Sequence, residues 1–98
     1  PVVAVVLDNG AWGAEKAYQR DFFGGRYLGA DLLNPDYAAF AEQIGAVGYR
    51  ASAPGEVGSA MVDALASGKP AVIQVTVDPD AMFSLRKDLF KPGDNRRA

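Results

Sequence analysis

The residues best suited to chemistry read Asp-Asn-Gly-Ala-Trp-Gly-Ala-Glu-Lys, directly after the apolar run Val2–Leu7. The pattern predicts a buried strand, a sharp turn and a helix, and ligands of parallel α/β sheets bind at such turns, outside the carboxyl ends of the strands. Asp8 and Asn9 offer the hard oxygen atoms that Mg²⁺ prefers. Gly10 and Gly13 allow the backbone to approach a ligand closely. The stretch therefore indicates a metal–phosphate corner, with an ordinary Asn-Gly turn as the alternative.

The composition narrows the possible functions. The chain has 98 residues, 49% of them hydrophobic, which suits one small domain with a real core. Its 12 acidic and 10 basic residues argue against a nucleic-acid partner. It has no cysteine and no histidine, which excludes disulfides, thiolate nucleophiles and histidine acid–base pairs and fits a cytoplasmic protein. No apolar run approaches the roughly 18 residues that a membrane span requires.

The order of expected elements is typical of a parallel α/β sheet. The continuous apolar run at the start predicts a strand buried on both faces. Two further strands are expected, over Ala46–Ala51 and Ala71–Val77, and the polar face of the latter indicates a strand near the sheet's edge or one facing a site. We therefore expect a three-stranded parallel half-sheet with flanking helices. Such a sheet leaves an open edge that requires a partner.

Three helices are expected between these strands, and each carries a start or stop signal. The first covers Ala14–Phe23 and ends at two glycines. The second starts from Asn34 as its N-cap with Pro35 at N1, and the third from Ser52 as its cap. The apolar spacing of the last two helices predicts that six side chains pack on the strands. These are Tyr37, Phe40, Ile44, Val57, Met61 and Leu65.

With these elements placed, nearly the whole chain resembles the C-terminal end of thiamine-diphosphate-dependent enzymes of the acetolactate synthase type. Single pieces of the pattern are common in α/β proteins, but the ordered set is specific. The matching pieces are Asp8-Asn9-Gly10, Trp12-Gly13-Ala14-Glu15-Lys16, Gln19-x-Asp21-Phe22, Asn34–Gly45, Gly68-Lys69-Pro70-Ala71-Val72-Ile73 and Asp78-Pro79.

The resemblance implies a role for the first turn in holding Mg²⁺ and the diphosphate of thiamine diphosphate. In the family, a motif that begins Gly-Asp-Gly and ends Asn-Asn holds the diphosphate through Mg²⁺. Asn9 matches its last residue, so its side-chain oxygen and the carbonyl of Ala11 would be metal ligands. Asp8 departs from the family's Asn; it either strengthens the metal site or hydrogen-bonds the turn, and we favour the turn. The implied cofactor-binding residues are Asp8, Asn9, Gly10, Ala11, Trp12 and Gly13.

The Gly-Asp-Gly half of this motif and the family's activating Glu are not in the sequence. We therefore expect residues 1–90 to be the C-terminal half of a thiamine-diphosphate-binding domain, residues 91–98 to be a mobile tail, and the remainder of a longer chain to be the partner. No catalytic residue is assigned here, and the 98 residues alone are expected to be inactive. A homo-oligomer is also expected.

The resemblance is nearest to the branch that cleaves sulfoacetaldehyde and passes the acetyl unit to phosphate. Glu15, Lys16 and Gln19 favour that branch. An acetolactate synthase or another 2-oxoacid carboligase is the alternative. A third interpretation, from another class, is a non-catalytic interaction module that pairs through its open sheet edge.

Other polar residues have both functional and plain interpretations. Lys16, Arg20 and Arg26 follow the turn and suit an anionic substrate group, although a solvated helix face is favoured. Trp12 either walls the site or packs, and packing is favoured. Asp78 and Asp80 are interpreted as turn and cap residues. A last short helix is expected over residues 82–90, in which residues 84–88 resemble the family's closing segment and either cover the active site or form a surface helix.

Overall fold

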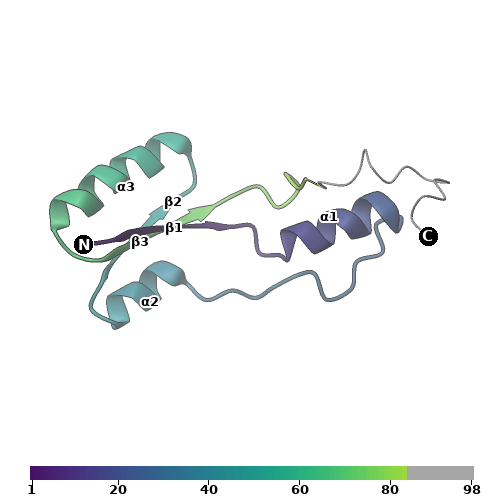
Figure 1. The fold of residues 1–98 in the computed structure, drawn as a ribbon, viewed down its shortest axis with the longest axis horizontal. Helices are drawn as coiled ribbons and strands as arrows, with labels where there is room; N and C mark the ends of the chain where they lie inside the picture. Colours follow the sequence, from purple (N-terminus) through teal and green to yellow (C-terminus); the bar gives the residue numbers. More distant parts are fainter. Residues whose placement is uncertain (84–98) are drawn as a thin grey trace. The chain divides into compact units, whose positions relative to one another are not determined.

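The computed structural model describes residues 1–83, in which a parallel sheet carries helices on both faces (Figure 1). The elements are β1 (Val3–Asp8), α1 (Gly13–Phe22), α2 (Tyr37–Gln43), β2 (Val47–Ala51), α3 (Pro54–Ser67) and β3 (Ala71–Thr76). The strands run parallel in the order β1-β3-β2. The predicted α/β class and three-stranded parallel sheet are confirmed. Within residues 1–83, no helix has the length and apolar character needed to cross a bilayer.

The chain forms two compact units. The first, here the sheet unit, contains Pro1–Asn9 and Asn34–Asp78. The second, here the α1 unit, contains Gly10–Leu33 and the residues from Pro79 onward. Each unit has its own hydrogen bonds and its own packing, so each is described by itself.

The central strand of the sheet is β3. Ile73 pairs with Val5 of β1 on one side and with Tyr49 of β2 on the other, and its side chain is fully buried. The edge position that its polar face suggested is therefore wrong. Part of that polar face is used inside the unit, because Oε1 of Gln74 accepts a 3.2 Å hydrogen bond from the backbone N–H of Ala38 at the start of α2.

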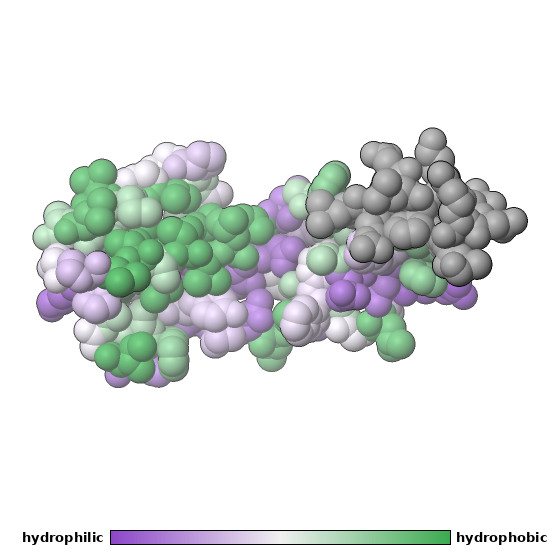
Figure 2. All heavy atoms as spheres, in the orientation of Figure 1, coloured by the Kyte–Doolittle hydropathy of each residue, from purple (hydrophilic) through white to green (hydrophobic). Residues whose placement is uncertain are grey.

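Within the described chain, β1 pairs on one side only, and it is not buried on both faces as predicted. Val5 is 41% exposed and Leu7 is 67% exposed. Figure 2 shows hydrophobic surface gathered over this part of the sheet unit. The apolar run did predict the strand, but a neighbour on the open side would be needed to bury it.

Helix α2 packs through small residues rather than large ones. Ala38 and Ala41 are buried, whereas Phe40 is 53% exposed and Ile44 is 67% exposed. The reason is a close approach of α2 to β2, where a Cβ on Gly48 would lie 2.2 Å from the carbonyl oxygen of Ala38. Because Gly48 has no Cβ, the backbone of α2 can lie this close to β2 with its alanine side facing the sheet, and the predicted burial of the two large side chains is wrong.

Helix α3 also packs through small residues, on the face of the sheet opposite to α2 (Figure 1). Its buried residues are Ala60 and Ala64, while Val57 and Met61 pack on the core only in part. Leu65, predicted to be buried, is 65% exposed. Tyr37 of α2, another residue of the predicted set, is half-buried.

Both predicted N-caps are corrected by the structure. Helix α2 is capped by Asp36, whose Oδ1 accepts a 3.1 Å hydrogen bond from the N–H of Ala39, because the side chain of Asn34 is engaged elsewhere. Helix α3 has Ala53 at its N-cap, since Pro54 occupies N1. The predicted helix ends are confirmed: Gly45 and Gly68 have φ angles of +86° and +66°.

The α1 unit matches its prediction within one residue. Tyr18 and Phe22 stack with ring centroids 5.6 Å apart, and Ala17 is buried. The helix ends before Gly24 and Gly25, whose φ angles are +64° and +72°. Met82 and Phe83 lie in no helix, and the rest of the helix expected over residues 82–90, the closing segment 84–88 and the tail 91–98 lie outside the described residues.

Candidate functional site

The carboxyl end of β1 is held by a side-chain contact. Oδ1 of Asp8 accepts a 2.7 Å hydrogen bond from Nδ2 of Asn34, and both residues are half-buried. This contact ties the end of β1, just before Asn9, to the segment that leads into α2. The contact gives the Asp8 carboxylate a structural partner outside the turn, and it engages the side chain of Asn34, which was predicted as a cap.

The glycine turn begins the α1 unit and has a backbone conformation that few residues other than glycine adopt. Gly10 has a φ angle of +69°, in the left-handed region. Its carbonyl accepts a 2.8 Å hydrogen bond from the N–H of Leu32, and the N–H of Trp12 donates to the carbonyl of Ala30 at 2.8 Å. Ala11 between them forms an antiparallel bridge with Asp31. The turn is thus hydrogen-bonded to residues 30–32, in the segment that returns after α1.

The predicted site residues are divided between the two units. Asp8 and Asn9 end the first stretch of the sheet unit, and Gly10 through Gly13 open the α1 unit. Trp12 is 59% exposed, so its side chain is not packed within the described residues. Its indole is accessible to a ligand or to another part of a larger protein.

Two of the three candidate cations are engaged in ion pairs. Nζ of Lys16 lies 2.5 Å from Oδ1 of Asp31 and 4.9 Å from the ring centroid of Tyr27, and the hydrogen bond to Asp31 raises the pKa of the ammonium group. Nε of Arg20 lies 2.9 Å from Oδ1 of Asp21, which raises the pKa of the guanidinium. The favoured interpretation, in which Lys16 and Arg20 only form a solvated helix face, is therefore wrong.

Arg26 has a different environment. It is exposed, and its one hydrogen bond within the described chain is a 3.1 Å contact from Nε to the carbonyl of Phe23. It lines an open hollow of about 480 Å³ beside α1. The lining also includes Glu15, Tyr18, Gln19, Phe23, Tyr27 and Leu28.

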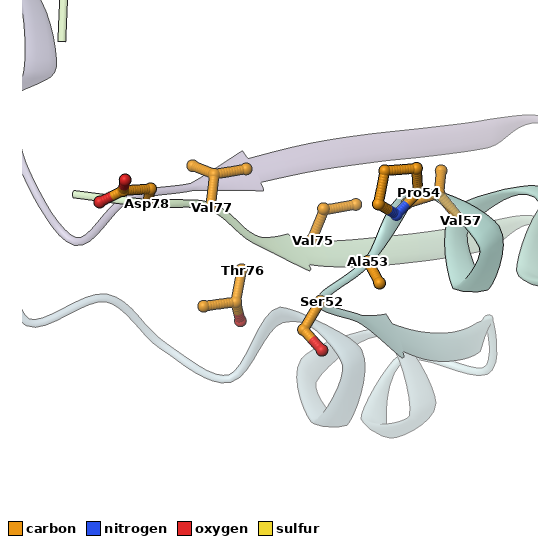
Figure 3. Close-up of a pocket in the computed structure, with 8 residues that line it drawn as sticks. All are labelled: Ser52, Ala53, Pro54, Val57, Val75, Thr76, Val77 and Asp78. Carbon is orange, nitrogen blue, oxygen red and sulfur yellow. The ribbon is translucent and has the colours of Figure 1, made fainter. Parts of the chain in front are cut away.

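A second hollow, which the sequence did not predict, lies in the sheet unit at the carboxyl ends of β2 and β3 (Figure 3). It is an open groove of about 500 Å³. Figure 3 shows Val75 and Val77 on one side of β3, with Thr76 and Ser52 extending toward the other. Asp78, predicted as a turn residue, lies at one end of this groove. The polar position of Thr76 at the strand's end was the one sequence signal for it.

The donor chemistry of the first turn can supply part of a metal site. Among residues 1–83, no group of three or more His, Cys, Asp or Glu side chains is placed to hold a metal ion. The oxygen donors at the turn are instead the amide of Asn9, the carbonyl of Ala11 and the carboxylate of Asp8. All three are hard donors, of the kind that Mg²⁺ prefers.

Comparison with known proteins gives a consistent result. The model of the family described as thiamine pyrophosphate enzyme, C-terminal TPP binding domain, matches residues 1–75. A sulfoacetaldehyde acetyltransferase from Alcaligenes xylosoxydans xylosoxydans is 34% identical over 97 residues, covering 94% of this chain and 16% of the relative. An acetolactate synthase large subunit from Mycobacterium tuberculosis is 33% identical over 88 residues, covering 90% of this chain and 16% of the relative.

A third relative carries another activity in its name. A 3D-(3,5/4)-trihydroxycyclohexane-1,2-dione hydrolase from Halalkalibacterium halodurans is 36% identical over 84 residues, covering 80% of this chain and 13% of the relative. The chain thus spans about one sixth of the length of the first two relatives. Relatives with three different activities match at similar identity, so the identities alone do not choose a substrate.

Proposed function

Since the chain belongs to the family of C-terminal TPP-binding domains of thiamine pyrophosphate enzymes, we propose that it forms one corner of the cofactor site in a longer transferase. The observation that carries this proposal is the turn after β1. Asn9, the left-handed Gly10 and Ala11 follow one another there, directly after a parallel strand, and Asn9 and Ala11 offer an amide oxygen and a backbone carbonyl.

Asn9 and Ala11 are the residues proposed to hold Mg²⁺, the first through its side-chain oxygen and the second through its backbone carbonyl. Gly10 separates them, and its positive φ angle permits the sharp change of direction. The bond from Asn34 to Asp8 fixes the strand end that delivers Asn9. When bound, thiamine diphosphate supplies the thiazolium carbanion chemistry that no amino-acid side chain provides.

For the reaction, we propose cleavage of sulfoacetaldehyde with transfer of the acetyl unit to phosphate. Lys16 and Gln19, two of the residues that favour this branch, both hold the segment that returns after α1. Lys16 pairs with Asp31, and the side chain of Gln19 bonds both the N–H and the carbonyl of Leu28, at 3.2 and 3.0 Å. The second candidate is an acetolactate synthase or another 2-oxoacid carboligase, favoured by the match to a synthase of that name.

An interaction module without catalysis is the proposal from another class. The observation in its favour is that β1 is an edge strand with exposed apolar side chains. The upstream gene sequence separates the two proposals. A Gly-Asp-Gly motif one strand–helix unit before Pro1 supports the enzyme, and a start codon there supports the module.

The activity itself is tested on the full-length protein with Mg²⁺ and thiamine diphosphate. Formation of acetyl phosphate from sulfoacetaldehyde and phosphate supports the transferase, and carboligation of a 2-oxoacid supports the alternative. The 98-residue chain serves as the control and is expected to be inactive and to bind the cofactor poorly. Micromolar binding of Mg²⁺–thiamine diphosphate to that chain contradicts the shared site. Light scattering of the same preparation tests the proposed homo-oligomer.

A further inference from the structure

The hollow beside α1 contains a cation whose charge no described carboxylate neutralises. Lys16 and Arg20 are paired with Asp31 and Asp21. Arg26 makes no ion pair within residues 1–83, and its one hydrogen bond among them uses Nε, so neither Nη group bonds to a described residue. A guanidinium presents these N–H groups in a planar fork that matches a carboxylate or a sulfonate.

Aromatic rings form much of the lining of the hollow, and two of them have a partner. The ring of Tyr18 stacks on Phe22, and one face of Tyr27 carries the ammonium of Lys16 at 4.9 Å. The amide of Gln19 is committed to both backbone groups of Leu28, so it fixes the rim and is not available to a ligand. An exposed guanidinium beside these aromatic rings can bind a negative group on a small organic body.

The carboxylate of Glu15, the other charged group of the lining, limits the charge that a ligand can carry. Glu15 lies on the same hollow and forms no ion pair with Arg26. The two charges together sum to zero, so a second negative charge on a ligand would meet Glu15 without a cation to balance it. A single negative charge on the ligand suits this arrangement better than two.

We propose that the hollow is a binding site for a small organic monoanion, a carboxylate or a sulfonate, whose charged end binds the guanidinium of Arg26. The inference rests on the proposed function only for the assignment of this monoanion as the acid group of the substrate. The binding site itself depends on the geometry of the α1 unit alone.

The experiment measures binding of ethanesulfonate to the full-length protein by calorimetry, with ethanol as the neutral probe of similar body. We expect saturable binding of ethanesulfonate and none of ethanol. Arg26→Gln should raise the dissociation constant at least tenfold, because it removes a charge-assisted bidentate contact. Arg26→Lys keeps the charge and should fall between the two. Lys69→Gln, which removes an exposed cation of the sheet unit, is the matched control and should stay within twofold of the parent.

A second readout is local to the hollow. Ethanesulfonate should slow the chemical modification of Arg26 by an arginine-specific dicarbonyl reagent, measured by peptide mass mapping, and should leave Arg50 unprotected. Equal protection of both arginines, no saturable binding, or an unchanged dissociation constant in Arg26→Gln would each overturn the proposal. Titration of Mg²⁺–thiamine diphosphate into the same proteins keeps the two proposals apart. If the full-length protein binds ethanesulfonate but not Mg²⁺–thiamine diphosphate, the proposed function is refuted and the monoanion site is not. If it binds the cofactor but not ethanesulfonate, the monoanion site is refuted and the proposed function is not.

Discussion

Asp8 and Asn34 are joined by a 2.7 Å hydrogen bond although they lie 26 positions apart in the chain. The bond ties the carboxyl end of β1 to the segment that leads into α2, within the sheet unit. The family has an Asn where this chain has Asp8. A carboxylate there has a structural partner in this chain, which explains how the departure from the family pattern is accommodated.

Removing this contact should destabilise the sheet unit. Asn34→Ala leaves a half-buried carboxylate without its amide donor, and we expect a loss of about 1–2 kcal/mol in the free energy of unfolding. Asp8→Asn keeps an acceptor oxygen at the same place and should cost less. Urea denaturation of both variants measures the difference. If Asn34→Ala unfolds at the urea concentration of the parent, the hydrogen bond does not stabilise the fold.

The cap of α2 gives the protein a pH-dependent contribution to stability. Asp36 accepts hydrogen bonds from Arg50 and from the N–H of Ala39, and the bond from Arg50 is the main cause of the lowered pKa of its carboxyl group. Because this pKa is lower in the folded than in the unfolded chain, the stabilisation is present above the ordinary value of 3.8 and is lost as the pH falls through the lowered value. Asp36→Asn retains an acceptor for the cap but should flatten the acid side of the stability–pH curve. A curve of unchanged slope below about pH 4 in that variant would contradict the assignment.

The contact between Gly48 and Ala38 predicts a large effect from one methyl group. Gly48→Ala would place a Cβ 2.2 Å from the carbonyl oxygen of Ala38, so α2 must move away from β2. We expect a loss of roughly 1–3 kcal/mol in the free energy of unfolding. Gly58→Ala in α3 is the matched control, because a Cβ there meets no atom within 4 Å. That variant should be neutral or stabilised by about 0.5–1 kcal/mol, since alanine favours a helix.

The sequence was sufficient for the class of the fold and for the identity of its elements. Apolar runs and glycine or proline signals predicted all six elements to within a few residues, because those signals act locally. The buried face of each helix, by contrast, depends on contacts with residues far away in the sequence. The close approach of α2 to β2 at Gly48 and Ala38 determines which face of α2 is buried. The spacing of Phe40 and Ile44 in the sequence does not reveal that approach.

The observed burial separates two isoleucines, one in β3 and one after α2, although the spacing predicted that Ile44 packs on the strands. Ile73 is fully buried and Ile44 is 67% exposed, so the same substitution should separate them. We expect Ile73→Ala to cost about 2–5 kcal/mol and Ile44→Ala less than about 1 kcal/mol. Thermal unfolding of the two variants side by side makes the comparison. Similar losses would mean that another surface covers Ile44.

The candidate site could be predicted from the sequence only in part. The turn from Asp8 to Gly13 is continuous in sequence, and its residue types were recognisable. The hydrogen bond from Asn34 joins residues 26 positions apart, and the hollow around Arg26 depends on how residues 23–28 fold back beside α1. The exposure of Trp12 was missed for a similar reason, since the segment that follows α1 bonds to its backbone and does not cover its side chain.

The proposed ligand role of Asn9 gives the most direct functional prediction. In the full-length protein with thiamine diphosphate and Mg²⁺, Asn9→Ala should sharply raise the cofactor concentration needed for half-maximal activity. The physical reason is that Mg²⁺ demands near-octahedral geometry and tolerates the loss of a ligand poorly. Saturating cofactor should restore part of the rate, because the substitution weakens binding and leaves the chemistry intact.

Asp8→Asn is the control for this experiment, since it creates the family's usual pair of asparagines and keeps an acceptor for the Asn34 amide. Its cofactor requirement should stay close to that of the parent. Activity measured against cofactor concentration for both variants decides between the two residues. If Asn9→Ala behaves like the parent while Asp8→Asn loses the cofactor, Asp8 is the metal ligand. The alignment of this turn with the family motif would then have to be abandoned.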